Sequence, residues 1–377
     1  MVYNYNENYW KSGDNVAVNR KYSYLKDYIG QMPEFVSEYV VEYYTGESIN
    51  TQIGYAIDIR VFLNYLKVEV LKGIDSIEKI TVKDIDSLRV TDLMHFKTYL
   101  KEYEQESITP TGKPIKRVYK NSAYGINRKM SAVRGLFIYL YKTEQIKENI
   151  TDKVDFAKLH QKIKKRLTAQ ETFDLLDAIM NGEKYYEGRL LSEYNRRKER
   201  DIAIFTTYLG TGIRVSELIN LNIEDVDFST NTFIVTRKGG DQQEIYMPHQ
   251  VKKCIKEYLD NNRNADTGPL FISRTQKRFT VAGIEKLLKG YCQTVGITNP
   301  DKARPHALRR TFACQLLEDG VDIKMVADLL GHKNIEVTHK YYAQYDARAR
   351  RELMESREPI PKELMDKNNK KKETKEE

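Results

Sequence analysis

Cysteine is scarce in this chain: its 377 residues include three, Cys254, Cys292 and Cys314, which lie far apart. No two of them form a C-x-x-C pair, and a dense disulfide framework is therefore excluded. Histidine is scarce too, with six residues. No stretch gathers histidine, cysteine and carboxylates at the spacing of a metal site. We expect free core thiols, and chemistry that needs neither a metal nor another cofactor.

Long apolar runs are also missing. No run approaches the roughly 20 apolar residues that cross a bilayer as a helix. The mean hydropathy is −0.63, and charged residues make up 31% of the chain. The start of the chain lacks the apolar core of a signal peptide. These features argue against a membrane protein, and we expect the chain to work in the cytoplasm.

Acidic residues are outnumbered: 62 Lys and Arg face 54 Asp and Glu, a net charge of +8. This balance fits an acidic partner such as nucleic acid, although many proteins without such a partner are basic. From Ser107 to Lys142 acids are absent altogether. A solvated helix face, the alternative, usually mixes both signs, so this block predicts a DNA-phosphate surface. The candidate contacts are Lys113, Lys116, Arg117, Lys120, Arg128, Lys129 and Arg134.

The pattern of apolar residues predicts two domains. Apolar residues recur every three or four positions at about 51–67, 90–104 and 121–142, which indicates a small all-helical domain. A capping box, Thr168 to Glu171, opens the second domain. There, alternation at 232–236 and 244–247 predicts a hairpin. We expect a mainly α protein with a small β-sheet (α+β). Its parts are an N-terminal extension (1–30), a helical domain (31–155), a basic linker (156–166), a second domain (167–350), and a C-terminal helix with a charged tail (351–377).

Residues suited to holding a phosphodiester follow one another in the second domain. Arg214 comes after a Gly-Thr-Gly turn, and His306 and Arg309 share one face of a helical pattern. His332 follows a helix-stop glycine, and Tyr341 lies nine positions later. Arginine is planar and always protonated, so it suits the charge that develops on phosphate oxygens during cleavage. A tyrosine oxygen is a possible nucleophile.

This ordered set resembles the tyrosine recombinase (phage integrase) family, either mobile-element integrases and transposases or Xer-like enzymes, over roughly residues 30–350. The resemblance implies a helical core-binding (SAM-like) domain that clamps one side of the DNA, followed by the catalytic domain. It implies that Tyr341 attacks the phosphate and that Arg214 and Arg309 clamp it. It also implies that His306 and His332 hydrogen-bond the phosphate.

The family's general acid is a lysine on a hairpin, which the resemblance places at Lys238, with Arg237 as its neighbouring rival. Glu217 resembles the acidic helper that orients the first arginine or a histidine. Tyr342 is the alternative nucleophile if the register is shifted by one residue. Arg310 departs from the family pattern, because many members have a second histidine there.

The function implied is site-specific recombination through a 3′-phosphotyrosyl intermediate, without metal or cofactor. The partners implied are double-stranded DNA and a homotetramer that holds two duplexes, and an accessory directionality factor is a further candidate. We expect integration, excision or transposition of a mobile element. The alternatives are chromosome- or plasmid-dimer resolution, relaxation like that of a type IB topoisomerase, and DNA binding by a protein with a degenerate centre.

Overall fold

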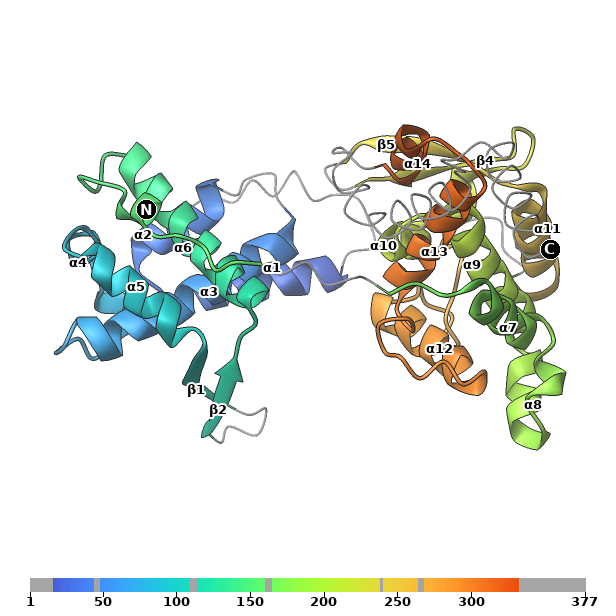
Figure 1. Cartoon of the computed structure of the whole chain (residues 1–377), viewed down its shortest axis with the longest axis horizontal. Coiled ribbons are helices and arrows are strands. Elements are labelled where there is room, and N and C mark those ends of the chain that lie inside the picture. The colour runs from blue at the N-terminus through green and yellow to red at the C-terminus, as the bar shows by residue number, and fades with distance from the viewer. Residues whose placement is uncertain are drawn as a thin grey trace, which may run out of the picture. The chain divides into compact units, whose positions relative to one another are not determined.

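The computed structural model describes residues 16–43, 48–108, 114–159, 165–237, 240–263 and 268–331 (Figure 1). The chain divides into two compact units, Met1–Gln161 and Lys162–Glu377, each with its own core. The division falls inside the basic stretch 156–166. No helix in the described ranges has both the length and the apolar character needed to cross a bilayer.

Helices make up most of the N-terminal unit. They are α1 (Val16–Ile29), α2 (Glu34–Glu38), α3 (Ile49–Tyr65), α4 (Val82–Asp86), α5 (Val90–Tyr99) and α6 (Ala123–Lys142). Side-chain caps begin the two longest: Ser48 accepts from the amide of Thr51, and Ser122 accepts from Gly125. Helices α3 and α6 pack against each other. Their apolar faces form the centre of the unit's core, so the periodicity read from the sequence marks the buried faces correctly.

A β-hairpin interrupts these helices, which corrects the expectation of an all-helical domain. Strands β1 (Glu102–Ile108) and β2 (Pro114–Lys120) pair antiparallel. The register sets Lys120 opposite Glu102, with an ion pair of 3.1 Å, and Val118 opposite Glu104. The acid-free block read from the sequence therefore lies beside an acidic strand. Pairing across the hairpin decides this local charge, and a count along the chain cannot show it.

Stacked tyrosines hold the hairpin to α5. Ring centroids of Tyr99 and Tyr103 are 5.2 Å apart, and those of Tyr103 and Tyr119 are 5.4 Å apart, both pairs stacked. Tyr65 of α3 continues the row, 5.1 Å from Tyr99. Burial raises the pKa of Tyr103 to about 12, so its hydroxyl stays protonated at neutral pH. The stack explains why the chain leaves the helix at Leu100 and enters a strand.

The C-terminal unit surrounds helix α9 (Lys198–Thr211), which packs against α7, α11 and α13 (Figure 1). The other helices are α7 (Ala169–Met180), α8 (Gly188–Asn195), α10 (Val215–Asn220), α11 (His249–Tyr258), α12 (Val281–Thr294), α13 (Pro305–Glu318) and α14 (Ile323–Leu330). The predicted capping box at Thr168 and Glu171 is present at the start of α7. A small antiparallel sheet has the order β3 (Val226–Asp227), β4 (Thr232–Thr236), β5 (Gln242–Tyr246).

A buried ionic network crosses the interior of this unit. Asp201 of α9 is fully buried and receives hydrogen bonds from Arg200 at 2.7 Å and from the hydroxyl of Tyr291 at 2.8 Å. Arg197 lies 3.3 Å from the same carboxylate. These partners compensate a charge that would otherwise be very costly to bury.

Taken over both units, the described residues form mainly helices with two small antiparallel sheets, so the expected mainly α fold class is confirmed.

Candidate active site

A glycine turn delivers Arg214 to the start of α10. Gly212 ends α9 in the left-handed conformation, with φ of 61°. A Cβ atom there would lie 2.2 Å from the ring of Phe312, so no other residue fits without rearrangement. Arg214 is the N-cap of α10, and its backbone amide donates to the carboxylate of Glu217 at 2.7 Å. The sequence predicted that the preceding helix stops at Gly210 and that a Gly210-Thr211-Gly212 turn puts Arg214 at the start of the next helix. Arg214 is at that start, but α9 continues through Thr211, so the turn begins only at Gly212.

Glu217 receives two arginines. Its Oε1 accepts from Nη1 of Arg214 at 2.7 Å, and its Oε2 accepts from Nη1 of Arg237, also at 2.7 Å. The amide of Arg214 donates to Oε2 as well. Burial alone would raise the pKa of Glu217, but the hydrogen bonds from Arg214 and the charge of Arg237 outweigh it and lower that pKa. Glu217 is therefore a buried anion that orients two cations.

Arg309 is 6% exposed on α13 and lies against the same turn. Its Nη1 donates to the carbonyl of Gly212 at 2.6 Å, and its Nη2 donates to the carbonyl of Leu330 at 2.5 Å. Burial, together with repulsion from Arg214, lowers the pKa of Arg309 to about 10. The group still carries its charge at neutral pH.

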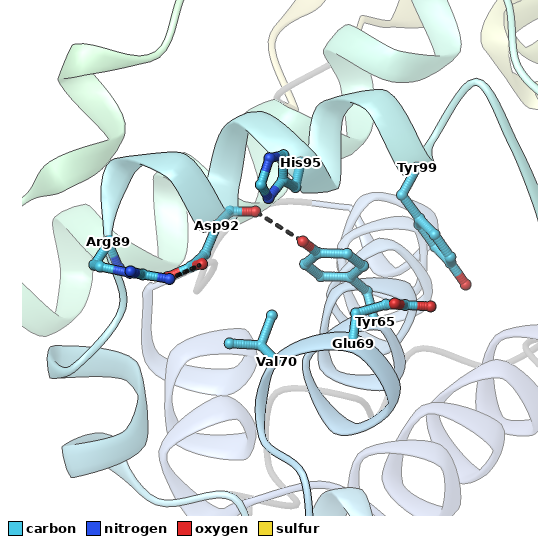
Figure 2. A pocket seen from close by; sticks show the side chains of 7 residues that line it. All are labelled: Tyr65, Glu69, Val70, Arg89, Asp92, His95 and Tyr99. Atoms are coloured by element: carbon cyan, nitrogen blue, oxygen red, sulfur yellow. Dashed lines mark hydrogen bonds and ion pairs between the residues drawn. The ribbon is translucent and has the colours of Figure 1, made fainter.

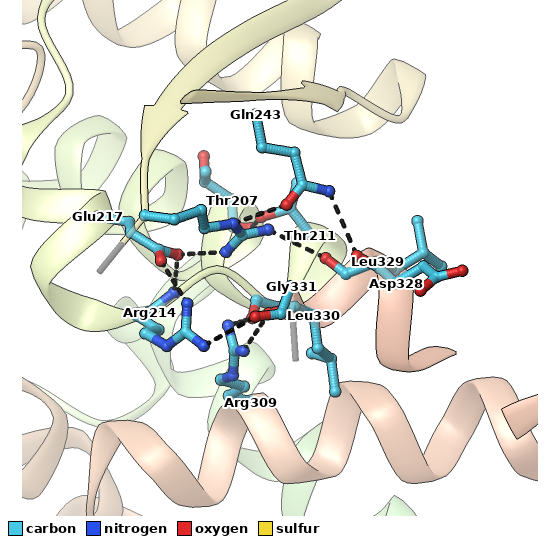
Figure 3. A network of polar contacts seen from close by, with 12 residues as sticks. Thr207, Thr211, Arg214, Glu217, Gln243, Arg309, Asp328, Leu329, Leu330 and Gly331 are labelled. Atoms are coloured by element: carbon cyan, nitrogen blue, oxygen red, sulfur yellow. Dashed lines mark hydrogen bonds and ion pairs between the residues drawn. The ribbon is translucent and has the colours of Figure 1, made fainter. Parts of the chain in front are cut away.

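Four side chains converge on the C-terminal turn of α14 (Figure 3). They donate to four successive carbonyls: Gln243 to Asp328, Arg237 to Leu329, Arg309 to Leu330 and Arg214 to Gly331. The last carbonyls of a helix lack partners within the helix, and its C-terminus carries partial negative charge. This end of α14 is therefore capped by residues from four other parts of the unit.

The cluster carries an excess of positive charge. Its described members include three guanidinium groups, those of Arg214, Arg237 and Arg309, and one carboxylate, Glu217. Arg214 is the most exposed of the three arginines, with 28% of its side chain accessible. Charges fixed in a partly dry site stabilise an anion more strongly than charges in water do. A phosphate, whose charge grows during cleavage, suits this site chemically.

Arg237 and Gln243 were missed as members of the site. The sequence pointed to Arg237 as a rival general acid, because it is the neighbour of Lys238. Its guanidinium instead faces inward, and its Nε donates to Oε1 of Gln243 at 2.7 Å. Nothing in the sequence singles out Gln243. Its role comes from the register of β4 and β5, which places it near the end of α14.

His306 and Arg310 of α13 are more exposed than Arg309. His306 is exposed on the first turn of the helix. Arg310, at the position where many family members have a histidine, donates to the carbonyls of Lys165 and His306. Its guanidinium is therefore directed away from the cluster around Glu217. Four predicted residues lie outside the described part of the chain: Lys238, His332, Tyr341 and Tyr342.

The predicted DNA-contacting residues differ in their surroundings. Lys116, Arg117 and Lys120 are exposed on β2, and Arg128 of α6 is half exposed while donating to Asp58 at 2.8 Å. Lys113 lies outside the described residues.

Two of these residues are not on an open surface. Lys129 is 7% exposed, and its ammonium donates to Asn121 at 3.0 Å. Arg134 donates to the carbonyls of Thr151 and Val154 and lies over the ring of Phe156. Their positive charges hold the N-terminal unit together, because α6 turns these two positions toward neighbouring segments.

A pocket of about 500 Å³ lies in the N-terminal unit beside α5, lined by Tyr65, Glu69, Val70, Arg89, Asp92, His95 and Tyr99 (Figure 2). The hydroxyl of Tyr65 donates to the backbone carbonyl of Asp92, whose side chain pairs with Arg89. None of these residues belongs to the predicted site, and the polar groups mainly bond one another.

Comparisons with known proteins identify a family. Residues 165–348 match the sequence profile of the Phage integrase family. The tyrosine recombinase XerC of Caldanaerobacter subterraneus subsp. tengcongensis is 31% identical over 330 residues, covering 84% of this chain and 85% of that protein.

Among solved structures, the XerH site-specific recombinase bound to a palindromic difH substrate matches with a TM-score of 0.60. The identity is 18%, and the match covers 91% of this chain and 90% of that one. The Tn1549 transposon integrase in complex with a circular intermediate DNA matches with a TM-score of 0.57 and 20% identity, covering 89% and 99%. These two likenesses show a shared fold. The chain belongs to the phage integrase family and is a tyrosine recombinase, an enzyme that cleaves and rejoins DNA.

Proposed function

We propose that this recombinase acts at specific DNA sites through a 3′-phosphotyrosyl intermediate and that it integrates, excises or transposes a mobile element. The observation that carries the mechanism is the pairing of Arg214 with the buried carboxylate of Glu217, beside the buried Arg309. Two guanidinium groups held this way are arranged before the substrate arrives. Such preorganisation lowers the barrier because no reorganisation is needed as charge develops.

The cleavage step assigns a role to each group. The phenolic oxygen of Tyr341 gives its proton to one of the two histidines, His306 or His332, and forms a bond to phosphorus, while the bond from phosphorus to the 5′ oxygen breaks. Arg214 and Arg309 stabilise the charge on the non-bridging oxygens, with His306 and His332 as hydrogen-bond partners. Lys238 gives a proton to the departing 5′ oxygen. The phosphotyrosine conserves the energy of the broken bond, so a 5′ hydroxyl from a partner strand reseals the DNA.

Trapping of covalent DNA tests the nucleophile. Duplex fragments from both sides of the gene are incubated with the protein and denatured in detergent, and the ends of the protein-bound DNA are mapped. Wild type and Tyr342→Phe should retain DNA, and Tyr341→Phe should retain none. A covalent adduct that survives Tyr341→Phe and disappears with Tyr342→Phe would move the nucleophile by one residue.

The mobile-element role rests on segments beyond a minimal two-domain recombinase, among them the β1–β2 hairpin and residues 182–198, which include α8. Dimer resolution is the second candidate, favoured by the 31% identity to a XerC protein. The mapped cleavage site separates them. Adducts on the fragments beside the gene, at the boundary of an element that contains it, support mobility. Adducts only on fragments from a distant chromosomal locus, tested in the same way, support resolution.

The partners follow from strand exchange between two duplexes. We infer a homotetramer on two specific double-stranded sites, working in the cytoplasm, with a directionality factor as a further partner. A plasmid assay separates recombination from simple relaxation. Recombination requires the mapped site on both partners, whereas a topoisomerase-like enzyme relaxes supercoiled plasmid that lacks the site.

A further inference from the structure

Arg237 links three elements of the catalytic unit. Its Nη1 donates to Glu217 at the start of α10, its Nη2 donates to the carbonyl of Leu329 at 3.2 Å, and its Nε donates to Gln243 of β5. The side chain is 7% exposed. Each guanidinium nitrogen already has a protein acceptor, and the group is buried. Arg237 therefore joins α10, β5 and the end of α14.

The backbone of Arg237 belongs to the turn that follows β4. Its amide donates to the carbonyl of Asp241 at 2.7 Å, and its carbonyl accepts from the amide of Gly240 at 3.0 Å. Lys238 is the next residue in the chain, and consecutive Cα atoms are separated by about 3.8 Å. The side chain of Arg237 thus fixes the residue that directly precedes Lys238 in the chain.

This anchor is tied to the phosphate clamp through one carboxylate. Arg214 occupies Oε1 of Glu217, and Arg237 occupies Oε2. A buried ion pair is often no more stabilising than an apolar pair, so stability gives little reason to place a charge here. The fork of an arginine can hold two acceptors in fixed directions, which a lysine cannot do.

We propose that Arg237 is a positioning residue, which holds the turn that carries Lys238 in register with Arg214 and the end of α14. The proposal rests on the proposed function, in which Lys238 protonates the 5′ oxygen that leaves. Without the anchor, Lys238 remains in the chain but no longer meets that oxygen. Leaving-group protonation should then suffer most, because Arg214 keeps both of its own hydrogen bonds to Glu217.

A change of leaving group tests this directly. Two nicked duplexes of the mapped site differ in one atom: the bridging 5′ atom at the cleaved phosphate is oxygen in one and sulfur in the other. A thiol, with a pKa of about 8.5, leaves as its anion, whereas an alcohol needs a proton. Single-turnover rates of adduct formation are measured for wild type, Arg237→Met, Arg237→Lys and Lys238→Ala.

On the oxygen substrate, Arg237→Met should react about 100-fold more slowly, the usual size of a lost general-acid contribution or of a misplaced group. On the sulfur substrate, Arg237→Met and Lys238→Ala should both form adducts at close to the wild-type rate. Arg237→Lys should lose less on the oxygen substrate and recover fully on the sulfur substrate. Its retained charge also provides a folded variant if Arg237→Met is unstable.

Arg278→Met is the matched control. Arg278 donates to the carbonyls of Ile219 and Leu221 and to the side chain of Asn222, all of them away from the β4–β5 turn. Any effect of its loss should be the same on both substrates. Equal slowing of Arg237→Met on both substrates, or no slowing on the oxygen substrate, overturns the positioning role. So does failure of sulfur to rescue Lys238→Ala. If wild type forms no adduct on either substrate, the proposed function itself fails.

Discussion

Gly331 and Arg237 lie so close that a Cβ atom on Gly331 would be 2.7 Å from Nε and 2.9 Å from Cζ of Arg237. Gly331 ends α14 in the left-handed conformation, with φ of 61°. The glycine thus meets two demands, one from its backbone conformation and one from the guanidinium packed against it. It directly precedes His332 in the chain.

Gly331→Ala should therefore lower stability and cleavage by more than backbone strain alone would. The left-handed conformation costs about 1–2 kcal/mol for a residue with a Cβ, and displacement of Arg237 adds to it. We expect lower stability and adduct formation about 100-fold slower, the loss typical of a misplaced catalytic group. Thermal melting and single-turnover cleavage measure the two effects.

Gly320→Ala controls for backbone strain, because Gly320 has φ of +83° and a Cβ atom added to it would meet no described atom within 4 Å. It should lose stability without a matching loss of cleavage. If the clash with Arg237 matters, Gly331→Ala combined with Arg237→Ala should lose less than the sum of the two single changes. Strict additivity would show that the contact is unimportant.

Asp201→Asn should destabilise the catalytic unit without acting on the chemistry. The change keeps the shape but leaves Arg197 and Arg200 without their buried counter-charge, a loss of about 3–5 kcal/mol. Urea unfolding measures it. Glu257→Gln breaks an exposed pair with Lys253 and should cost less than about 1 kcal/mol. Below its unfolding transition Asp201→Asn should still form adducts, and a similar effect of both changes would contradict the buried network.

The buried carboxyl group of Asp58 should make the stability of the N-terminal unit depend on pH. Burial outweighs the attraction of Arg128 and Lys129 and raises the pKa of Asp58 from 3.8 to about 6. A raised folded-state pKa means that its contribution to stability is full below the unfolded pKa and is lost as pH rises through about 6. By linkage, the free energy of unfolding should fall by about 2 kcal/mol between pH 4 and 6.

Hydrogen exchange of amides in α3 and α6 follows this unit as a function of pH. The asparagine of Asp58→Asn cannot ionise. In this variant the free energy of unfolding should therefore no longer fall between pH 4 and 6 because of residue 58. Asp75→Asn is the control, because it changes an exposed carboxylate that pairs with Lys79. In this variant the fall of the free energy of unfolding with pH should remain. An unchanged slope in Asp58→Asn would show that the buried carboxylate does not titrate in this range.

The hairpin and α6 should differ in how they affect DNA binding. Arg117 is exposed, so if it contacts phosphate, Arg117→Ala should weaken binding to any duplex and reduce the salt slope by about 0.9. Lys129→Met should instead lower stability, because the buried carboxylate of Asp58 and the side chain of Asn121 lose a partner. Titrations of fluorescent duplex at several salt concentrations measure both variants. A reduced slope for Lys129→Met, or an unchanged one for Arg117→Ala, would reverse this assignment.

Much of the fold could be predicted because its signals are local. The apolar period of residues 121–142, the capping box at Thr168 and the stop at Gly331 each depend on neighbours within one or two helical turns. The hairpin at 102–120 was missed, since its stability depends on a tyrosine stack that reaches back to Tyr65. The burial of Lys129 was missed because charge along a chain does not reveal which face of a helix is covered.

The order of residues along this chain determined its helices and the chemical types available to the site, because propensity, capping and the resemblance carried by Arg214, Arg309 and Tyr341 are written in short stretches. Only the tertiary structure decided that Arg237 faces inward to share Glu217 with Arg214. That contact joins residues 20 positions apart through the register of a strand pair and the packing of α14. Such contacts depend on how separate elements dock, and no local pattern encodes the direction in which one guanidinium turns.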